Sequence, residues 1–230
     1  MKIPDNIFGK DREAELKKYL EESKRQPEVK EQPKPQINLE GFDKGDYIYL
    51  PNHNLYVSKQ RTHFNEDWYK AHESLNSEGA RMLNLREFAD FLAILKNGNA
   101  DFKRLYKEIT EVRDPWRAEW LDASFKTLKN ADQISYNHRI INGKLAPQNK
   151  EPLEACLMED CKVDLGSFNK QGFPTTKGSD FDYWYPRDGA VAGFYAGSGG
   201  AGLDCDRGPR YSGSRDGGPV LGVRQARAKI

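Results

Sequence analysis

The sequence predicts a mixed α+β domain, and three observations support this class. Two short β-rich runs come first, two amphipathic helical segments follow, and a glycine-rich C-terminal segment then alternates small or apolar residues with polar ones. Separate runs of strands and helices are typical of α+β proteins. A two-residue alternation is the period of a strand whose two faces differ.

The two β-rich runs cover residues 46–50 and 55–58. They flank Pro-Asn-His-Asn at 51–54, which contains turn-forming residues, so we expect an antiparallel hairpin. A later segment combines charged residues with Trp116 and Trp120. We interpret that segment as structural and expect both tryptophans to enter the core.

Two helices are expected after the hairpin. The first covers about 65–79, and the second begins at Asn84, where Glu87 three residues later completes a capping box. Gly98 is expected to end the second helix, and a further helical stretch is predicted over 102–109. The apolar-face residues are Trp68, Ala71, His72 and Leu75 in the first helix and Phe88, Phe91, Leu92 and Leu95 in the second.

The composition narrows the possible function classes. The chain has 230 residues, of which 37% are hydrophobic and 31% are charged, and this suits one core with a very polar surface. The formal net charge is +1, so we expect no nucleic-acid partner. The sequence has neither the apolar stretch of a signal peptide nor a run of about 18 apolar residues that would predict membrane insertion. We expect a protein that is cytoplasmic or is displayed on a virion or cell surface through another component.

The N-terminal part differs from the rest of the chain. Residues 1–36 alternate acidic and basic residues and end in a proline-containing linker, a composition that cannot build a core. Leu16, Tyr19 and Leu20 lie at helical spacing, which fits either a tether or oligomerisation segment or a solvated tail. We therefore predict an extension over 1–36 and a folded domain over 37–230.

The C-terminal segment carries the most informative pattern. Eleven of the 20 glycines lie between Gly189 and Gly222, which disfavours a helix. Alternate residues of a strand point to opposite faces, and the pair Gly199-Gly200 shifts the phase as a turn or bulge would. One predicted face holds Ala196, Ser198, Ala201, Leu203 and Cys205, and the other holds Tyr195, Gly197, Gly199, Gly200, Gly202, Asp204 and Asp206.

The second of these faces is unusual for a strand. Strand surfaces prefer β-branched and aromatic residues, whereas this face mixes glycine and aspartate with tyrosine. Glycine, tyrosine and small polar residues are typical of adaptable binding surfaces. Glycines in a strand are equally typical of a place where another backbone approaches closely. The alternation by itself leaves both interpretations open.

Several motifs resemble a known family. They are Trp-Tyr-Pro-Arg-Asp at 184–188, Val-Ala-Gly-Phe at 191–194, the alternating run, and Leu-Gly-Val-Arg at 221–224. An upstream block from Leu50 to Trp116 is also similar. These segments resemble the variable proteins of diversity-generating retroelements, most closely the archaeal and candidate-phylum type. The resemblance leaves only the N-terminal extension unassigned.

The resemblance implies a C-type-lectin-like fold with two helices, small antiparallel sheets and a glycine-rich, irregular C-terminal ligand-binding region at about 184–224. In that family a reverse transcriptase mutates template adenines, so that asparagine codons come to encode glycine, aspartate, tyrosine and serine. The implied protein is a non-enzymatic receptor or adhesin that binds a protein or other macromolecular surface without a cofactor. Its implied ligand-binding positions are Gly193, Tyr195, Gly197, Gly199, Gly200, Gly202, Asp204, Asp206, Gly208, Tyr211 and Gly213.

Two alternatives share the implied fold. The Leu-Gly-Val-Arg motif also resembles the sulfatase-modifying branch, whose formylglycine-generating oxidases would need reactive cysteines lining one pocket. A viral tail adhesin without diversification would instead show the same residues at the alternating positions in every copy. Arg207, Arg210 and Arg215 fit either the scaffold or the variable surface.

We expect no metal site and no catalytic residues. Cys156 and Cys161 lack a second ligand pair at zinc spacing, and Cys205 is expected to be a small packed hydrophobe. Asp180 and Asp182 are interpreted as loop carboxylates rather than calcium ligands. The histidines are scattered along the sequence, at His53, His63, His72 and His138.

Overall fold

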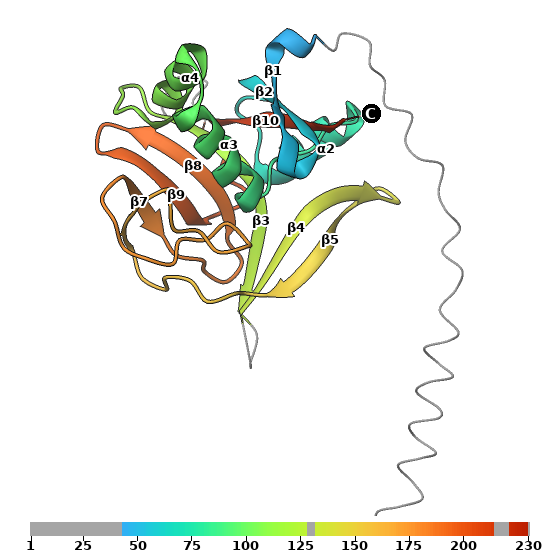
Figure 1. Cartoon of the computed structure of the whole chain (residues 1–230). Helices are drawn as coiled ribbons and strands as arrows, with labels where there is room; N and C mark the ends of the chain where they lie inside the picture. The colour runs from blue at the N-terminus through green and yellow to red at the C-terminus, as the bar shows by residue number, and fades with distance from the viewer. Residues whose placement is uncertain (1–42, 128–131, 214–220, 230) are drawn as a thin grey trace, which may run out of the picture. The chain divides into compact units, whose positions relative to one another are not determined.

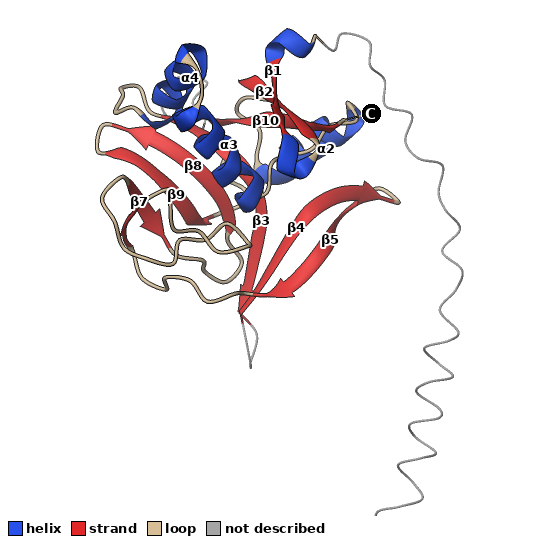
Figure 2. Ribbon diagram, in the orientation of Figure 1, coloured by secondary structure: helices blue, strands red, loops and turns tan. Residues whose placement is uncertain are grey.

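The computed structural model describes residues 43–127, 132–213 and 221–229. In these ranges the chain is a mixed α+β protein with three α-helices and ten strands that belong to one sheet (Figures 1 and 2). The predicted extension over 1–36 and its boundary lie outside the described residues. None of the described helices has the length and apolar character needed to cross a membrane.

The predicted N-terminal hairpin is confirmed. After a short 3-10 turn at Lys44–Asp46, strand β1 (Tyr47–Leu50) pairs antiparallel with β2 (Leu55–Thr62). A second 3-10 turn (Pro51–His53) connects them, and Asn54 closes it in the left-handed region at φ 51°. Asparagine tolerates this conformation better than most residues, which fits the turn chemistry of the sequence.

Both predicted helices are present. Helix α2 (Trp68–Ser77) begins a few residues later than expected because the Asp67 side chain caps it by accepting from the backbone N–H of Lys70. Helix α3 (Leu85–Asn97) has the predicted capping box between Asn84 and Glu87. The helical stretch predicted over 102–109 is confirmed as a third helix, α4 (Ala100–Thr110), one more among the described residues than the two helices that the resemblance implies.

The remaining strands are β3 (Arg117–Thr127), β4 (Asp132–Ile141), β5 (Lys144–Pro152), β6 (Cys161–Val163), β7 (Phe181–Trp184), β8 (Val191–Gly197), β9 (Gly200–Arg207) and β10 (Leu221–Ala228). Their order is β1-β2-β10-β3-β8-β9-β7-β6, and the β4–β5 hairpin extends from β3. We expected small antiparallel sheets. The structure instead has one mixed sheet, because β10 lies between β2 and β3 and pairs parallel with β3. A second parallel pair joins β7 to β9.

The sheet packs against helices on two faces. On the first face, α3 and α4 cover a large core that includes Phe91, Phe194 and Leu203. On the second face, α2 covers a smaller core that includes Trp68 and Trp120. Figure 2 shows α3 and α4 over the β8 and β9 side of the sheet and α2 beside β10. Beyond α2, the second face continues over β8, β9 and β7.

A buried ion-pair network ties the central strands together. Glu119 of β3 is 1% exposed and pairs with Arg224 of β10 (Nε–Oε2, 2.8 Å) and with Arg117 (Nη2–Oε1, 3.0 Å). Burial by itself raises the pKa of Glu119, but the charges of Arg224, Arg117 and Arg61 outweigh this and hold the pKa below its ordinary value. The carboxylate is therefore ionised at neutral pH and offsets the buried guanidinium charges.

Candidate functional site

The hairpin of β8 and β9 carries the alternating segment. Its register pairs Phe194 with Leu203, Tyr195 with Gly202 and Ala196 with Ala201. Directly opposed residues of an antiparallel pair share a face, so each face is defined by these pairs. The turn at 198–199 reverses the chain and produces the predicted shift of phase.

The face with small and apolar residues points inward, as the alternation predicts. Ala196 and Cys205 are fully buried, and Ala201 and Leu203 are 4% and 5% exposed. The neighbouring Phe194 packs its ring 5.1 Å from that of Phe88 on α3 and 5.7 Å from that of Phe181 on β7. The expectation for Ser198 is wrong, since it lies in the exposed turn.

The opposite face presents what we call the outer platform, which consists of Asp182, Trp184, Tyr195, Asp204 and Arg207. Asp206 lies at the register shift between β8 and β9 and pairs instead with Arg187. The Tyr195 ring lies 5.2 Å from the Trp184 ring. Asp204 accepts hydrogen bonds from two guanidinium nitrogens of Arg207, at 2.9 and 2.7 Å. Asp182 pairs with Lys162 at 2.9 Å. The platform therefore combines aromatic surface with carboxylates that already have cationic partners.

The phenol of Tyr195 remains neutral on this platform. Partial burial raises its pKa well above the ordinary value, and the nearby carboxylates of Asp182 and Asp204 raise it further. A neutral hydroxyl can both donate and accept a hydrogen bond. Tyr195 can thus offer ring surface and a polar group to a ligand.

The glycines among the implied positions divide into three groups by exposure and backbone conformation. Gly199 and Gly208 are exposed, and a Cβ atom added at either would meet nothing within 4 Å. Gly200 is partly exposed but has φ 130°, where other side chains are strained. Gly197 and Gly213 are buried, as are Gly193 and Gly202, so the expectation that all these positions are exposed is wrong.

The packing around Gly202 gives the physical reason. An added Cβ would lie 2.8 Å from the backbone oxygen of Asp182 on the neighbouring strand, with Tyr195 and Trp184 closing over it. At Gly193 the Glu119 backbone oxygen would lie 3.2 Å away. Close approach of another backbone therefore explains these two glycines.

A loop after β9 extends the platform. Tyr211 is 38% exposed, and the Arg207 guanidinium lies 5.3 Å from its ring centre. The ring of Trp116 is 6.4 Å from that of Tyr211. Trp120 is 1% exposed, so its predicted place in the core is confirmed. Trp116 is only partly buried and packs at the edge of the smaller core. Sequence reasoning missed Trp116 and Trp184 as members of this surface.

The surroundings of the three cysteines disfavour the thiolate form. Cys205 is fully buried in the large core, as expected for a packed hydrophobe, while Cys156 and Cys161 are partly buried and all three thiols are free. Burial raises the pKa of each thiol above its ordinary value. Since the thiolate is the nucleophile, these surroundings disfavour cysteine-based oxidation chemistry.

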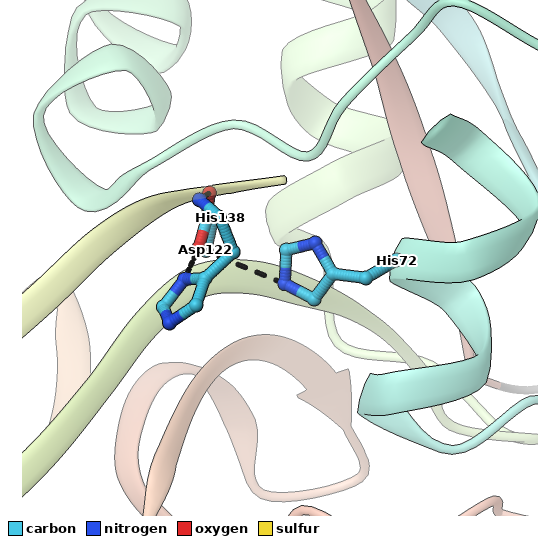
Figure 3. Close-up of side chains that lie close together, drawn as sticks. All are labelled: His72, Asp122 and His138. Atoms are coloured by element: carbon cyan, nitrogen blue, oxygen red, sulfur yellow. Dashed lines mark hydrogen bonds and ion pairs between the residues drawn. The ribbon is translucent and has the colours of Figure 1, made fainter. Parts of the chain in front are cut away.

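A second cluster lies apart from the platform, between α2, β3 and β4. His72, Asp122 and His138 converge there although they are far apart in the sequence (Figure 3). His72 and Asp122 are fully buried and His138 is 4% exposed. Burial lowers the pKa of His72 to about 4, so its ring is neutral at neutral pH. The signal for this cluster was a histidine on the otherwise apolar face of the first helix.

The outer platform is thus an aromatic and polar surface built on a buried scaffold of small residues. Its candidate contact residues come from β7, β8, β9 and the loops at 116 and 211. No family model, curated protein or solved structure matches the chain.

Proposed function

We propose that this chain is a non-enzymatic ligand-binding protein of C-type-lectin-like fold, and that the outer platform is its recognition surface. In this proposal a retroelement diversifies the exposed residues of the C-terminal segment. The ligand is a protein or another macromolecular surface, and the binding protein acts in the cytoplasm or is displayed through another component.

The observation that supports the proposal most is that the two faces of β8 and β9 differ in burial. Ala196, Ala201 and Cys205 are buried in the core, while Tyr195 and Asp204 lie on the opposite face. Surface substitutions away from buried features usually change stability by less than about 0.5 kcal/mol. A chain with this arrangement can change its recognition residues while its backbone stays the same.

The exposure of the side chains supports a smaller set of variable positions. Tyr195, Asp204, Asp206 and Tyr211 have side chains that reach partly or fully into solvent. At Gly199 and Gly208 an added Cβ atom would meet nothing within 4 Å, so a side chain can begin there without a clash. We therefore assign diversification to these six positions first, and we expect Gly193 and Gly202 to accept larger residues only if neighbouring backbone moves.

The chemistry of the platform suits a macromolecular surface. Trp116, Trp184, Tyr195 and Tyr211 supply rigid rings, which offer contact area at a low cost in conformational entropy. Asp204 and Arg207 hold each other by charge-assisted hydrogen bonds, so the polar groups are oriented before a ligand arrives. Preorganisation of this kind reduces the ordering cost of binding.

Sequencing the DNA that flanks the gene tests the proposal. We expect a reverse-transcriptase gene and a near-identical repeat of the segment encoding the platform. Differences between repeat and gene should occur only at template adenines, in codons for outward residues such as Tyr195 and Asp204. The codons of Ala196, Ala201, Leu203 and Cys205 serve as the internal control and should be unchanged. The absence of a repeat, or differences spread over the inward codons, would contradict the proposal and favour an undiversified adhesin.

A further inference from the structure

The cluster of His72, Asp122 and His138 brings together three side chains whose donor atoms can bind a metal ion, although His138 and Asp122 are now hydrogen-bonded and would have to separate slightly to share one. Its donor atoms all lie within 4.8 Å of one another. His138 Nδ1 lies 2.5 Å from Asp122 Oδ1, and His72 Nε2 lies 3.6 Å from the same oxygen. Figure 3 shows the rings approaching the carboxylate from two sides, His72 from α2 and His138 from β4.

His72 is the member that hydrogen bonding does not explain. Its side chain is fully buried, and neither ring nitrogen has a hydrogen-bond partner. The 3.6 Å separation from Asp122 is longer than a normal N–H···O bond of about 2.7–3.2 Å. Burying a polar group without a partner costs about 1–3 kcal/mol. A ligand located between the three side chains would satisfy this ring.

The groups around Asp122 fix the orientation of its carboxylate. Its second oxygen accepts a hydrogen bond from the His138 backbone N–H at 2.8 Å, which fixes the carboxylate plane. The Trp68 ring stands edge-on to both imidazoles, with ring centres 4.3 Å from His72 and 4.9 Å from His138. Such support around the donors limits their motion, as it does around metal ligands in general.

We propose that His72 Nε2, Asp122 and His138 Nδ1 bind one divalent transition-metal ion, with zinc as the best fit. Two imidazole nitrogens and one carboxylate form a donor set that suits zinc and its first-row neighbours, whereas calcium and magnesium prefer oxygen donors alone. On binding, the ion takes the place of the hydrogen bond between His138 Nδ1 and Asp122 Oδ1, and His138 coordinates as a neutral ring that carries its one proton on Nε2.

A groove lies beside the cluster and contacts it through His138. The groove has a volume of about 520 Å³, and its wall also includes Trp68, Ser135 and Leu145. A water molecule in this groove can supply the fourth ligand of a tetrahedral site. The ion would link α2 to β3 and β4, so binding should raise the free energy of unfolding. The site is separate from the outer platform and does not depend on the proposed recognition function.

Titration of the full chain with zinc, after treatment with a chelator, tests the inference. We expect one zinc ion per chain by isothermal titration and by metal analysis after gel filtration, with an increase in Tm. His72→Gln should weaken binding by more than about 100-fold, because even groups behind the ligands are worth about 10–100-fold. His53→Gln is the matched control, since His53 also pairs with a carboxylate, Asp90, at 2.7 Å, and this variant should bind as the unaltered chain does.

A spectroscopic measurement on the unaltered chain covers the case in which His72→Gln fails to fold. Zinc should shift the side-chain ¹⁵N resonances of His72 Nε2 and His138 Nδ1 and leave those of His53 and His63 in place. Cobalt should give the visible absorption of a four-coordinate site. The inference is overturned if neither ion binds stoichiometrically, if His72→Gln folds and binds zinc unchanged, or if the shifted resonances belong to other histidines.

Discussion

The two faces of β8 and β9 use the same backbone for opposite purposes. The inward face is sealed by α3 and α4 and contains residues such as Phe194 and Leu203 that are almost fully buried. The outward face carries Tyr195 and Asp204, and no described helix covers it as α2 covers Trp120 on the same side of the sheet. This difference in burial between the two faces shows that alternation in a strand can separate the residues that stabilise a fold from those that are free to recognise a partner.

The outward face is itself divided. Next to β10, α2 packs on Trp120, Val191 and Val223, and this half of the face is apolar and buried. Toward β7, the face is aromatic and charged and is partly open to solvent. The comparison therefore predicts that the cost of a substitution depends first on which face of the strand it alters, and then on whether a neighbouring backbone limits the space.

Replacing an inward ring should have the largest effect. Phe194→Ala removes a buried ring that contacts Phe88 and Phe181, and we expect it to cost about 3–5 kcal/mol of unfolding free energy. The adjacent Tyr195→Ala is the matched control and should cost about 1 kcal/mol, because surface substitutions are far less damaging. Urea denaturation of both variants measures the difference. Equal losses would show that the faces are not distinct.

Removing the buried carboxylate should have the next largest effect, and this effect should depend on pH. Glu119→Gln leaves Arg117 and Arg224 without their anion and should cost about 3 kcal/mol near neutral pH. The pKa of Glu119 is lowered in the folded protein, so its contribution is present above the pKa of an unfolded glutamate, about 4.3, and is lost as the pH falls through the lower folded value. Unfolding measured from pH 7 down to pH 3 should show the gap between the two proteins narrowing. A gap that widens with acid would contradict this account of the network.

Two glycine substitutions should give the smallest changes in stability. They separate the effect of the strand face from the effect of a nearby backbone. Gly202→Ser places a Cβ atom 2.8 Å from the Asp182 backbone oxygen, and we expect a loss of about 1–3 kcal/mol. Gly199→Ser meets no atom within 4 Å and should change stability by less than about 0.5 kcal/mol. Thermal unfolding of the two variants distinguishes a glycine required by packing from one at a freely variable position. If Gly202→Ser leaves the thermal stability unchanged, Gly202 belongs with the positions that can vary freely.

Local sequence signals predicted much of the fold. The capping box of Asn84 and Glu87, the stop at Gly98 and the hairpin around Asn54 depend on neighbouring residues, and all three occur as predicted. The inward positions of Ala196 and Leu203 were predictable because strand alternation is also a local property. The mixed α+β class follows from the order of these elements.

The features that were missed depend on contacts between distant segments. Gly202 looks like an open position until β7 is placed beside β9, and Trp116 resembles a core residue until Tyr211 is brought near it. His72 and His138 converge on Asp122 only after α2 and the β4 strand pack on β3. Sequence spacing carries no information about such long-range pairs.

Two libraries of variants test whether the outward residues of β8 and β9 can change while the inward residues cannot. One library randomises the outward positions Tyr195, Gly199, Asp204 and Gly208, and the other randomises the inward positions Ala196, Ala201, Leu203 and Cys205. Each library is displayed and sorted for resistance to protease, which measures the fraction of variants that fold. The account predicts that most outward variants survive and that most inward variants are lost. Equal survival, or better survival of the inward library, would contradict it.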